Sequence, residues 1–259
     1  MIFDTHAHYD DPQFDEDREQ LLASFDGEGI GYVVDIGASI DTTRKALELA
    51  HRYDFIYAAV GVHPSEVEEL TEDNFELLRE WSEDGRCVAI GEIGLDYHWP
   101  EPGRELQKKW FRRQLELARE KQLPVVIHSR DAAKDTVDIM REEHAEEIGG
   151  VVHCFSYSKE VAKECLEMGF YIGVGGVITF KNGKKLREVV EMTPMDRILL
   201  ETDSPYLAPE PYRGKRNSSL NLPFVVSKIA RIKGISEEEV IRITEENAKT
   251  MYNMHFVKE

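Results

Sequence analysis

The sequence predicts an α/β fold with eight parallel strands, each followed by a helix, and three observations lead to this expectation. Short apolar runs alternate with longer amphipathic stretches, and the pair recurs eight times. Most of the apolar runs are continuous, as expected for parallel strands that are covered on both faces. The length of 259 residues is typical of a closed (β/α)8 barrel of the TIM type, which usually has about 250 residues.

The expected strands are short, and the last of them ends at residue 202: Ile2–Thr5, Tyr32–Ile36, Ile56–Val62, Cys87–Ile93, Leu123–Ile127, Gly150–His153, Phe170–Val174 and Ile198–Thr202. The expected helices come between and after them: Asp15–Phe25, Asp41–His51, Thr71–Trp81, Arg104–Lys121, Ala132–Glu147, Lys159–Met168, Lys184–Met192, Leu222–Lys233 and Ser236–Asn253. Asp41 and Thr71 are suitable N-terminal caps, and Gly169 is suited to end a helix. The last two helices are additional C-terminal elements.

Residues 1–259 are expected to form one domain, because the sequence has no internal repeat, low-complexity segment or linker. A doubly wound open sheet is the alternative fold. Such a sheet usually carries a glycine-rich phosphate loop after its first strand. Here that position holds His6-Ala7-His8 instead, which favours the barrel.

Composition limits the cellular setting and the partners. No run of about 18 apolar residues predicts a membrane span, and no signal sequence is evident. Cys87, Cys154 and Cys165 have no Cys-x-x-Cys spacing, which is typical of a reduced, cytoplasmic protein. The net charge of −18 opposes nucleic-acid binding unless bound cations or a local basic patch offset it. We infer no obligate protein partner.

Histidines and carboxylates recur where the expected strands end, which is the catalytic end of such a barrel. His6 and His8 are two residues apart, so their side chains share one face of the first strand. Further candidates follow the later strands: His63, Glu92, His128, His153 and Asp203. Taken singly, each could be a core histidine, a solvated charge or a turn residue. Their recurrence at the same end of so many strands favours a hydrolytic metal site.

Seven short motifs then make the likeness specific: Phe3–His8, Gly61–Pro64, Gly91–Tyr97, Pro124–Arg130, His153–Ser156, Glu201–Tyr206 and Arg213–Asn217. In their order and spacing, they resemble the TatD family of deoxyribonucleases within the metal-dependent amidohydrolase superfamily. Tyr157 departs from the family pattern, which often has glycine there, and it could narrow the pocket or change the substrate preference.

The resemblance implies two divalent ions with Glu92 as their bridge. Many amidohydrolases use a carbamylated lysine in that role. His6, His8 and Asp203 would hold one ion, and His128 and His153 the other. Histidine-rich sites accept Zn²⁺, Mn²⁺ or Ni²⁺, whereas Mg²⁺ prefers oxygen ligands. The sequence therefore leaves the identity of the metal open.

The chemistry implied is hydrolysis of a phosphodiester by water that two metal ions activate. Asp203 would be the general base, with Glu92 holding the ions. His63 would bind phosphate or protonate the leaving group. Glu201, two residues before Asp203, should share its strand face and orient a histidine.

Several residues near the expected site are suited to binding a nucleic acid. Arg213, Lys215 and Arg216 form a basic cluster after the last strand, where phosphate binding competes with a solvated loop as the interpretation. Arg130 is a further phosphate candidate. Tyr97 and Trp99 could stack on bases or simply pack their loop.

We therefore expect a TatD-type DNase that acts as an exonuclease on single-stranded ends of DNA, with RNA as a second nucleic acid to test. Polarity and direction come from the resemblance alone. One alternative is a hydrolase of another bond: a cyclic amide, a lactone or the ester of a mischarged aminoacyl-tRNA. The other is a non-catalytic metal-binding scaffold, which turnover with added metal would exclude.

Overall fold

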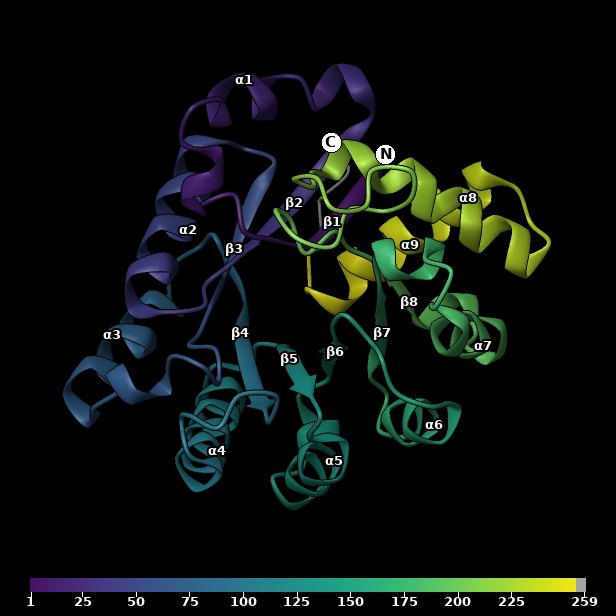
Figure 1. Cartoon of the computed structure of the whole chain (residues 1–259). Helices are drawn as coiled ribbons and strands as arrows, with labels where there is room; N and C mark the ends of the chain where they lie inside the picture. Colours follow the sequence, from purple (N-terminus) through teal and green to yellow (C-terminus); the bar gives the residue numbers. More distant parts are fainter. Residues whose placement is uncertain (255–259) are drawn as a thin grey trace.

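The computed structural model describes residues 1–254 and contains one eight-stranded parallel sheet in the order β1-β2-β3-β4-β5-β6-β7-β8. Its strands are β1 (Ile2–Ala7), β2 (Ile30–Ile36), β3 (Ile56–Val60), β4 (Cys87–Asp96), β5 (Val125–Arg130), β6 (Gly150–Val152), β7 (Tyr171–Val174) and β8 (Ile198–Leu200). The helices are α1 (Arg18–Ala23), α2 (Ile40–Arg52), α3 (Glu72–Trp81), α4 (Arg104–Lys121), α5 (Ala133–Glu142), α6 (Lys159–Glu167), α7 (Lys184–Met192), α8 (Leu222–Lys233) and α9 (Glu237–Met251). Helices surround the strands (Figure 1), which confirms the predicted TIM barrel.

The expected elements are all present, and their ends differ where local interactions extend or stop them. Helix α1 begins only at Arg18, because Asp11 caps a separate 3₁₀ turn over Pro12–Phe14. Helix α5 ends earlier than expected, since His144 takes a left-handed backbone conformation with φ of 51°. Strand β4 is longer than expected and reaches Asp96, because its last residues pair with the end of β5.

Strands β1 and β8 close the barrel largely through side chains. A single bridge joins Ala7 to Ser204, beside backbone bonds such as Asp203 N–H to the His6 carbonyl at 2.9 Å. The Asp4 carboxylate, fully buried, accepts bonds from the backbone N–H groups of His6 and Thr202 and from the Thr202 hydroxyl. Strand β1 is thereby held against the segment that continues β8.

A buried hydroxyl chain extends this connection to the segment before α8. Ser219 donates through its hydroxyl to Asp4 Oδ2 at 2.6 Å and through its backbone N–H to the Tyr9 hydroxyl. Tyr9 therefore donates its own proton to Ser219 Oγ, 2.8 Å away. Asp4 thus gathers donors from three separate segments of the chain.

The barrel interior is apolar at the end where the strands begin. The interior layer includes Phe3, Val34, Val126 and Leu199, and residues of α9 pack against it. Asn247 of α9 donates to the carbonyls of Met195 and Ile198 at the start of β8. Helix α9 therefore covers this end, and substrate access is left to the opposite end.

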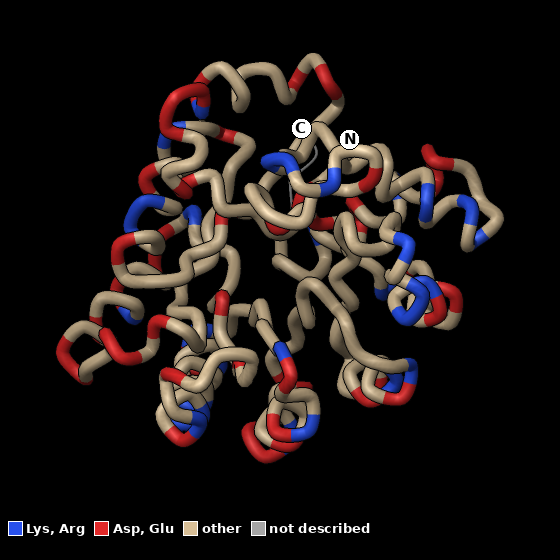
Figure 2. The backbone as a smooth tube through the Cα atoms, in the orientation of Figure 1, with Lys and Arg blue, Asp and Glu red and all other residues tan. Residues whose placement is uncertain are grey.

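Charged residues lie mostly on the surrounding helices and loops (Figure 2). Many form surface ion pairs such as Arg44 with Asp41 and Lys121 with Glu83. Such pairs contribute little individually to the free energy of folding. No helix within residues 1–254 is both long and apolar enough to cross a membrane.

Candidate metal centre

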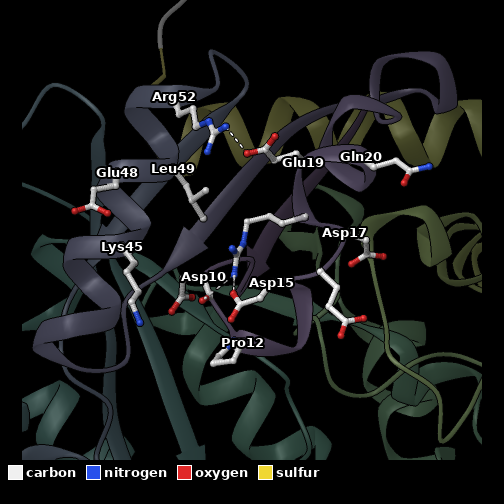
Figure 3. Close-up of a pocket in the computed structure, with 12 residues that line it drawn as sticks. Asp10, Pro12, Asp15, Asp17, Glu19, Gln20, Lys45, Glu48, Leu49 and Arg52 are labelled. Carbon is white, nitrogen blue, oxygen red and sulfur yellow. Dashed lines mark hydrogen bonds and ion pairs between the residues drawn. The ribbon is translucent and has the colours of Figure 1, made fainter.

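The carboxyl ends of the strands surround a cavity of about 920 Å³, which we call the metal cavity. The candidate residues that line it are His8, His63, Glu92, Arg130, His128, His153 and Asp203. His6 lies just beneath, almost fully buried. A second hollow of about 590 Å³ adjoins the cavity at Asp10 and Pro12 and runs between α1 and α2 (Figure 3). It is predominantly acidic, so we call it the acidic hollow.

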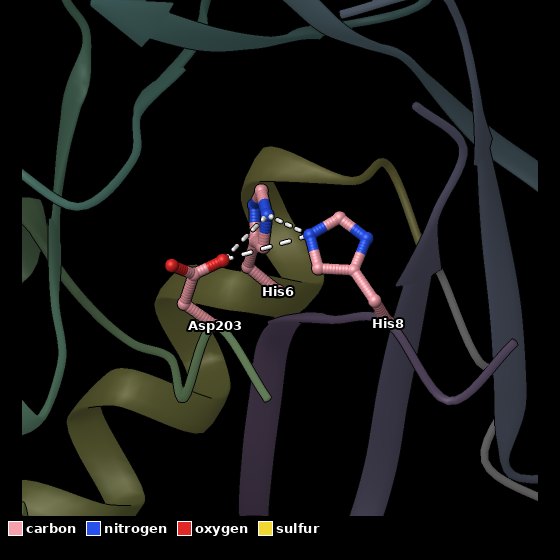
Figure 4. A group of neighbouring side chains, drawn as sticks. All are labelled: His6, His8 and Asp203. Atoms are coloured by element: carbon pink, nitrogen blue, oxygen red, sulfur yellow. Dashed lines mark hydrogen bonds and ion pairs between the residues drawn. The ribbon is translucent and has the colours of Figure 1, made fainter. Parts of the chain in front are cut away.

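His6, His8 and Asp203 form the first group of ligand atoms (Figure 4). The two Nε2 atoms are 3.2 Å apart, and they lie 3.7 Å and 3.5 Å from Asp203 Oδ1. His8 must donate through Nδ1 to the Ile36 carbonyl at 2.9 Å, so its Nε2 is the atom that is available to an ion. Glu92 Oε2 is 3.5 Å and 3.8 Å from the same two nitrogens. These converging ligand atoms fit a divalent cation.

Glu92, His128 and His153 form the second group. Glu92 Oε1 is 2.8 Å from His128 Nδ1 and 2.6 Å from His153 Nε2, and these nitrogens are 3.2 Å apart. His128 donates through Nε2 to Asp96 Oδ2 at 3.1 Å, so its Nδ1 is the atom that faces Glu92 and His153. The two oxygens of Glu92 therefore face different groups, as a bridging carboxylate would require.

The electrostatics of this end of the barrel favour a positive charge. Burial alone would raise the pKa of Glu92, but the surrounding histidines, led by His153, hold it well below its usual range. Burial, and then His153, lowers the pKa of His6 to about 4. Burial would also lower the pKa of His8, yet Asp203 and Glu92 raise it to about 10. A bound cation would take the place of that proton.

His63 forms a further group of possible ligand atoms with Glu92 and His128. Burial, followed by His128, lowers its pKa to about 3, so the ring is neutral. The backbone N–H of Ser65 donates to His63 Nδ1 at 3.1 Å, which places the ring proton on Nε2. That nitrogen is 3.7 Å from Glu92 Oε1 and can act as a hydrogen-bond donor in the cavity.

Glu201 is buried beneath both groups. Its Oε1 accepts a bond from the Cys154 backbone N–H, while Oε2 has no partner among the described residues. The Nδ1 atoms of His6 and His153 also lack partners there, and ligand atoms of the three side chains lie within 4.8 Å of one another. A Cβ atom at Gly173 would lie 2.3 Å from Glu201 Oε2, so glycine leaves the space for this carboxylate.

Asp96 is the functional residue that sequence reasoning missed. It stands within a matching motif, four residues after Glu92, but the motif gave it no role. In the structure its carboxylate holds the His128 ring, an arrangement typical of histidines that bind metals. Burial would raise the pKa of Asp96, but the hydrogen bond from His128 lowers it. Its position four residues after Glu92, at the carboxyl end of β4, was the sequence signal that could have marked Asp96 as a candidate site residue.

The aromatic and phosphate candidates near the cavity fall into different positions. Arg130 and Trp99 line the metal cavity, and Trp99 is 59% exposed. Tyr97 does not line it: its hydroxyl donates to Asp135, and Arg104 lies over its ring. Trp99 is therefore better placed than Tyr97 to meet a substrate.

The Tyr157 side chain lies behind the cavity wall and does not line it. Its hydroxyl is 2.9 Å from Ser129 Oγ and accepts a bond from the Ala132 backbone N–H at 3.1 Å. Tyr157 therefore supports the segment between β5 and α5, and the cavity is not narrowed by its ring.

The basic cluster after β8 lies beside the cavity and not in it. Arg216 donates to both Asp17 carboxylate oxygens and to the Gln13 carbonyl, so its charge already has a partner. Arg213 and Lys215 form no ion pair with any acidic residue within positions 1–254.

Comparison with known proteins identifies the family to which the chain belongs. The family of TatD-related DNases matches residues 3–253. The metal-dependent hydrolase YabD of Bacillus subtilis is 46% identical over 98% of this chain and 100% of its own length. The crystal structure of YjjV, a TatD homologue from Escherichia coli, has a TM-score of 0.92, 31% identity and 98% coverage of both chains. A TatD-family hydrolase from Entamoeba histolytica has a TM-score of 0.88 and 26% identity, covering 97% of this chain and 98% of its own. The chain therefore belongs to the TatD family of metal-dependent hydrolases.

Proposed function

We propose that this protein hydrolyses phosphodiester bonds in DNA, as an exonuclease on single-stranded ends, with two divalent ions. The observation that supports it most is the position of Glu92, whose two oxygens face two separate groups of histidine and carboxylate ligands. His6, His8 and Asp203 would hold one ion, and His128 and His153 the other. Bound ions would lower the pKa of a water molecule and neutralise charge on phosphoryl oxygens.

The residues of the chain would then bind the phosphate and move the proton. Asp203 Oδ1 faces His6 and His8, whereas its other oxygen points away from them (Figure 4). That second oxygen is suited to accept the proton of the attacking water. His63 would donate from Nε2 to a phosphoryl oxygen, since its neutral ring carries the proton there. Arg130 would bind a phosphate oxygen from the cavity wall.

Glu201 would act from beneath the ligands. Its free Oε2 is suited to accept a hydrogen bond from Nδ1 of a neighbouring imidazole, which would orient the ring toward an ion. Burial raises the pKa of Glu201 to about 8. A cation bound near His6 and His153 would lower this pKa, because its positive charge stabilises the carboxylate.

A panel of metals and substrates tests the proposal. Chelator-stripped protein is reconstituted with Zn²⁺, Mn²⁺, Ni²⁺ or Mg²⁺ and given single-stranded DNA labelled at either end, RNA, a cyclic amide, a lactone and a mischarged aminoacyl-tRNA. We expect metal-dependent release of nucleotides from DNA. Turnover of the amide, lactone or tRNA ester without cleavage of DNA would replace the proposal by another hydrolase, and no turnover at all would favour a scaffold. The Asp203→Asn variant, purified identically, controls for contaminating nucleases.

Glu92→Gln should weaken metal binding at both positions, because a neutral amide replaces the charge that both groups share. We expect the affinity for each ion to fall by about tenfold or more. Elemental analysis after dialysis against limiting metal measures the loss, with the exposed Glu28→Gln as a matched control. Retention of two tightly held ions would exclude Glu92 as the bridge. Absence of metal from the wild type after reconstitution would contradict the binuclear site itself.

A further inference from the structure

A third hollow, of about 510 Å³, adjoins the metal cavity. Its lining includes Phe180, Tyr206, Leu207, Arg213, Lys215 and Arg216, and we call it the basic hollow. Tyr206 and Leu207 also line the metal cavity, so the two spaces meet at these residues. A chain-like substrate cleaved in the metal cavity could continue directly into the basic hollow.

The two hollows that adjoin the metal cavity carry opposite net charges. The acidic hollow is lined by six carboxylates, including Asp15, Glu19 and Glu48, against three cationic side chains. The described lining of the basic hollow has three cationic side chains and no carboxylate. Since Arg216 is paired with Asp17, Arg213 and Lys215 supply the uncompensated charge. A polyanion would therefore be repelled at the acidic hollow and attracted at the basic hollow.

The segment around the basic hollow is held in place by its own hydrogen bonds. Asn217 donates through its backbone to the Pro205 carbonyl at 2.9 Å and through its side chain to the Thr202 carbonyl at 3.0 Å. The Tyr206 backbone N–H donates to the Asp203 carbonyl at 2.8 Å. Arg213 and Lys215 therefore lie on a hydrogen-bonded segment that follows Asp203 directly in the sequence. Because this segment is already ordered, less conformational entropy is lost when a ligand binds.

The side chains at the junction present both an aromatic face and a fixed cation. Tyr206 is 50% exposed, and its hydroxyl donates to Asp11 Oδ2 at 3.1 Å, which restrains the ring. The Arg213 guanidinium carbon is 4.2 Å from the centre of the Phe180 ring, so stacking orients its donors. A base could stack on Tyr206 while an adjacent phosphate accepts hydrogen bonds from Arg213.

We propose that the basic hollow is a distal subsite that binds the nucleic-acid strand next to the scissile bond. Tyr206 stacks on a base there, and Arg213 and Lys215 bind a backbone phosphate. Arg216 acts as an anchor for the segment and not as a phosphate ligand. This inference rests on the proposed phosphodiesterase function, and it adds the direction in which the strand leaves the metal cavity.

The test compares a long and a short phosphodiester. The long substrate is a single-stranded hexanucleotide, and the short one is the p-nitrophenyl ester of thymidine 5′-phosphate, which is too small to span both spaces. In Arg213→Gln/Lys215→Gln, the ratio of kcat/KM on the hexanucleotide to that on the ester should fall about tenfold, mainly through KM. Binding of a fluorescent hexanucleotide to metal-loaded protein should lose about 0.7 from its salt slope, the value for one phosphate contact on a single strand.

The control is Lys163→Gln/Arg231→Gln, which removes the same charge from exposed positions on α6 and α8. We expect its substrate ratio and salt slope to match the wild type. If the wild type hydrolyses both phosphodiesters and the Arg213/Lys215 variant matches it in ratio and slope, the subsite is wrong and the proposed function stands. If the wild type hydrolyses neither but its hexanucleotide binding depends on Arg213 and Lys215, the subsite stands and the proposed function fails. Absence of hexanucleotide binding to the wild type overturns the subsite.

Discussion

Asp203→Asn is expected to lower kcat on DNA by a factor of roughly 10²–10⁴, the usual contribution of a positioned acid–base group. Asparagine keeps the size of the side chain and one oxygen ligand toward His6 and His8. It loses the charge that accepts a proton from water. Burial would raise the pKa of Asp203, yet the hydrogen bond from His8 and the charges of His6 and His153 lower it. The wild-type carboxylate is therefore ionised and ready at neutral pH.

Kinetics at saturating metal separate this role from metal binding. The variant and the wild type are compared at equal metal content, which elemental analysis establishes, and the pH dependence of kcat is recorded. The matched control is Asp196→Asn, because Asp196 is exposed and lies just before β8, the strand that Asp203 follows. Near-normal kcat in a fully loaded Asp203→Asn protein would assign proton transfer to another group.

Asp4→Ala is expected to destabilise the metal-free protein by about 3–5 kcal/mol. The buried carboxylate accepts bonds from His6, Thr202 and Ser219. Alanine would remove this acceptor, and Thr202 would keep only its 3.3 Å contacts with the His6 carbonyl. Each unsatisfied buried group costs about 1–3 kcal/mol, and breaking a buried network is among the most damaging single changes. His6 and Asp203 would also lose their relative position, so metal affinity should fall.

Urea unfolding of the metal-free proteins measures the change in stability, and metal titration measures the second effect. Asp54→Ala removes an exposed carboxylate from the turn between α2 and β3 and serves as the control. A destabilisation below about 1 kcal/mol would mean that other groups or water replace the Asp4 carboxylate at the junction of β1 and β8.

The sequence pattern was sufficient to predict the barrel and the candidate metal ligands. Helices α4, α7 and α8 have the predicted bounds, because each is a long amphipathic stretch with clear ends. The candidate ligands were predictable for a related reason. Parallel strands of one barrel end at the same edge, so chemistry-bearing residues after successive strands must meet there. This rule alone was enough to predict that His6 and Asp203 lie close together, although they are far apart in the sequence.

Side-chain partners were less predictable, because they depend on contacts between distant segments. Arg216 was a phosphate candidate by its charge, but only the fold brings Asp17 to it. The same holds for Tyr97, whose hydroxyl donates to Asp135 of α5. The tautomer of His63 depends on the backbone of Ser65, and residue types alone do not specify that geometry.

Asp203, which completes the first group of ligands, is synthesised 197 residues after His6 (203 − 6). The second group needs only Glu92, His128 and His153, so its last member is synthesised 50 residues earlier (203 − 153). A nascent chain could therefore assemble the Glu92–His128–His153 group while β8 is still missing. We expect the order of synthesis to favour metal capture at that group first, with the ion beside β1 and β8 entering only as the ring of strands closes.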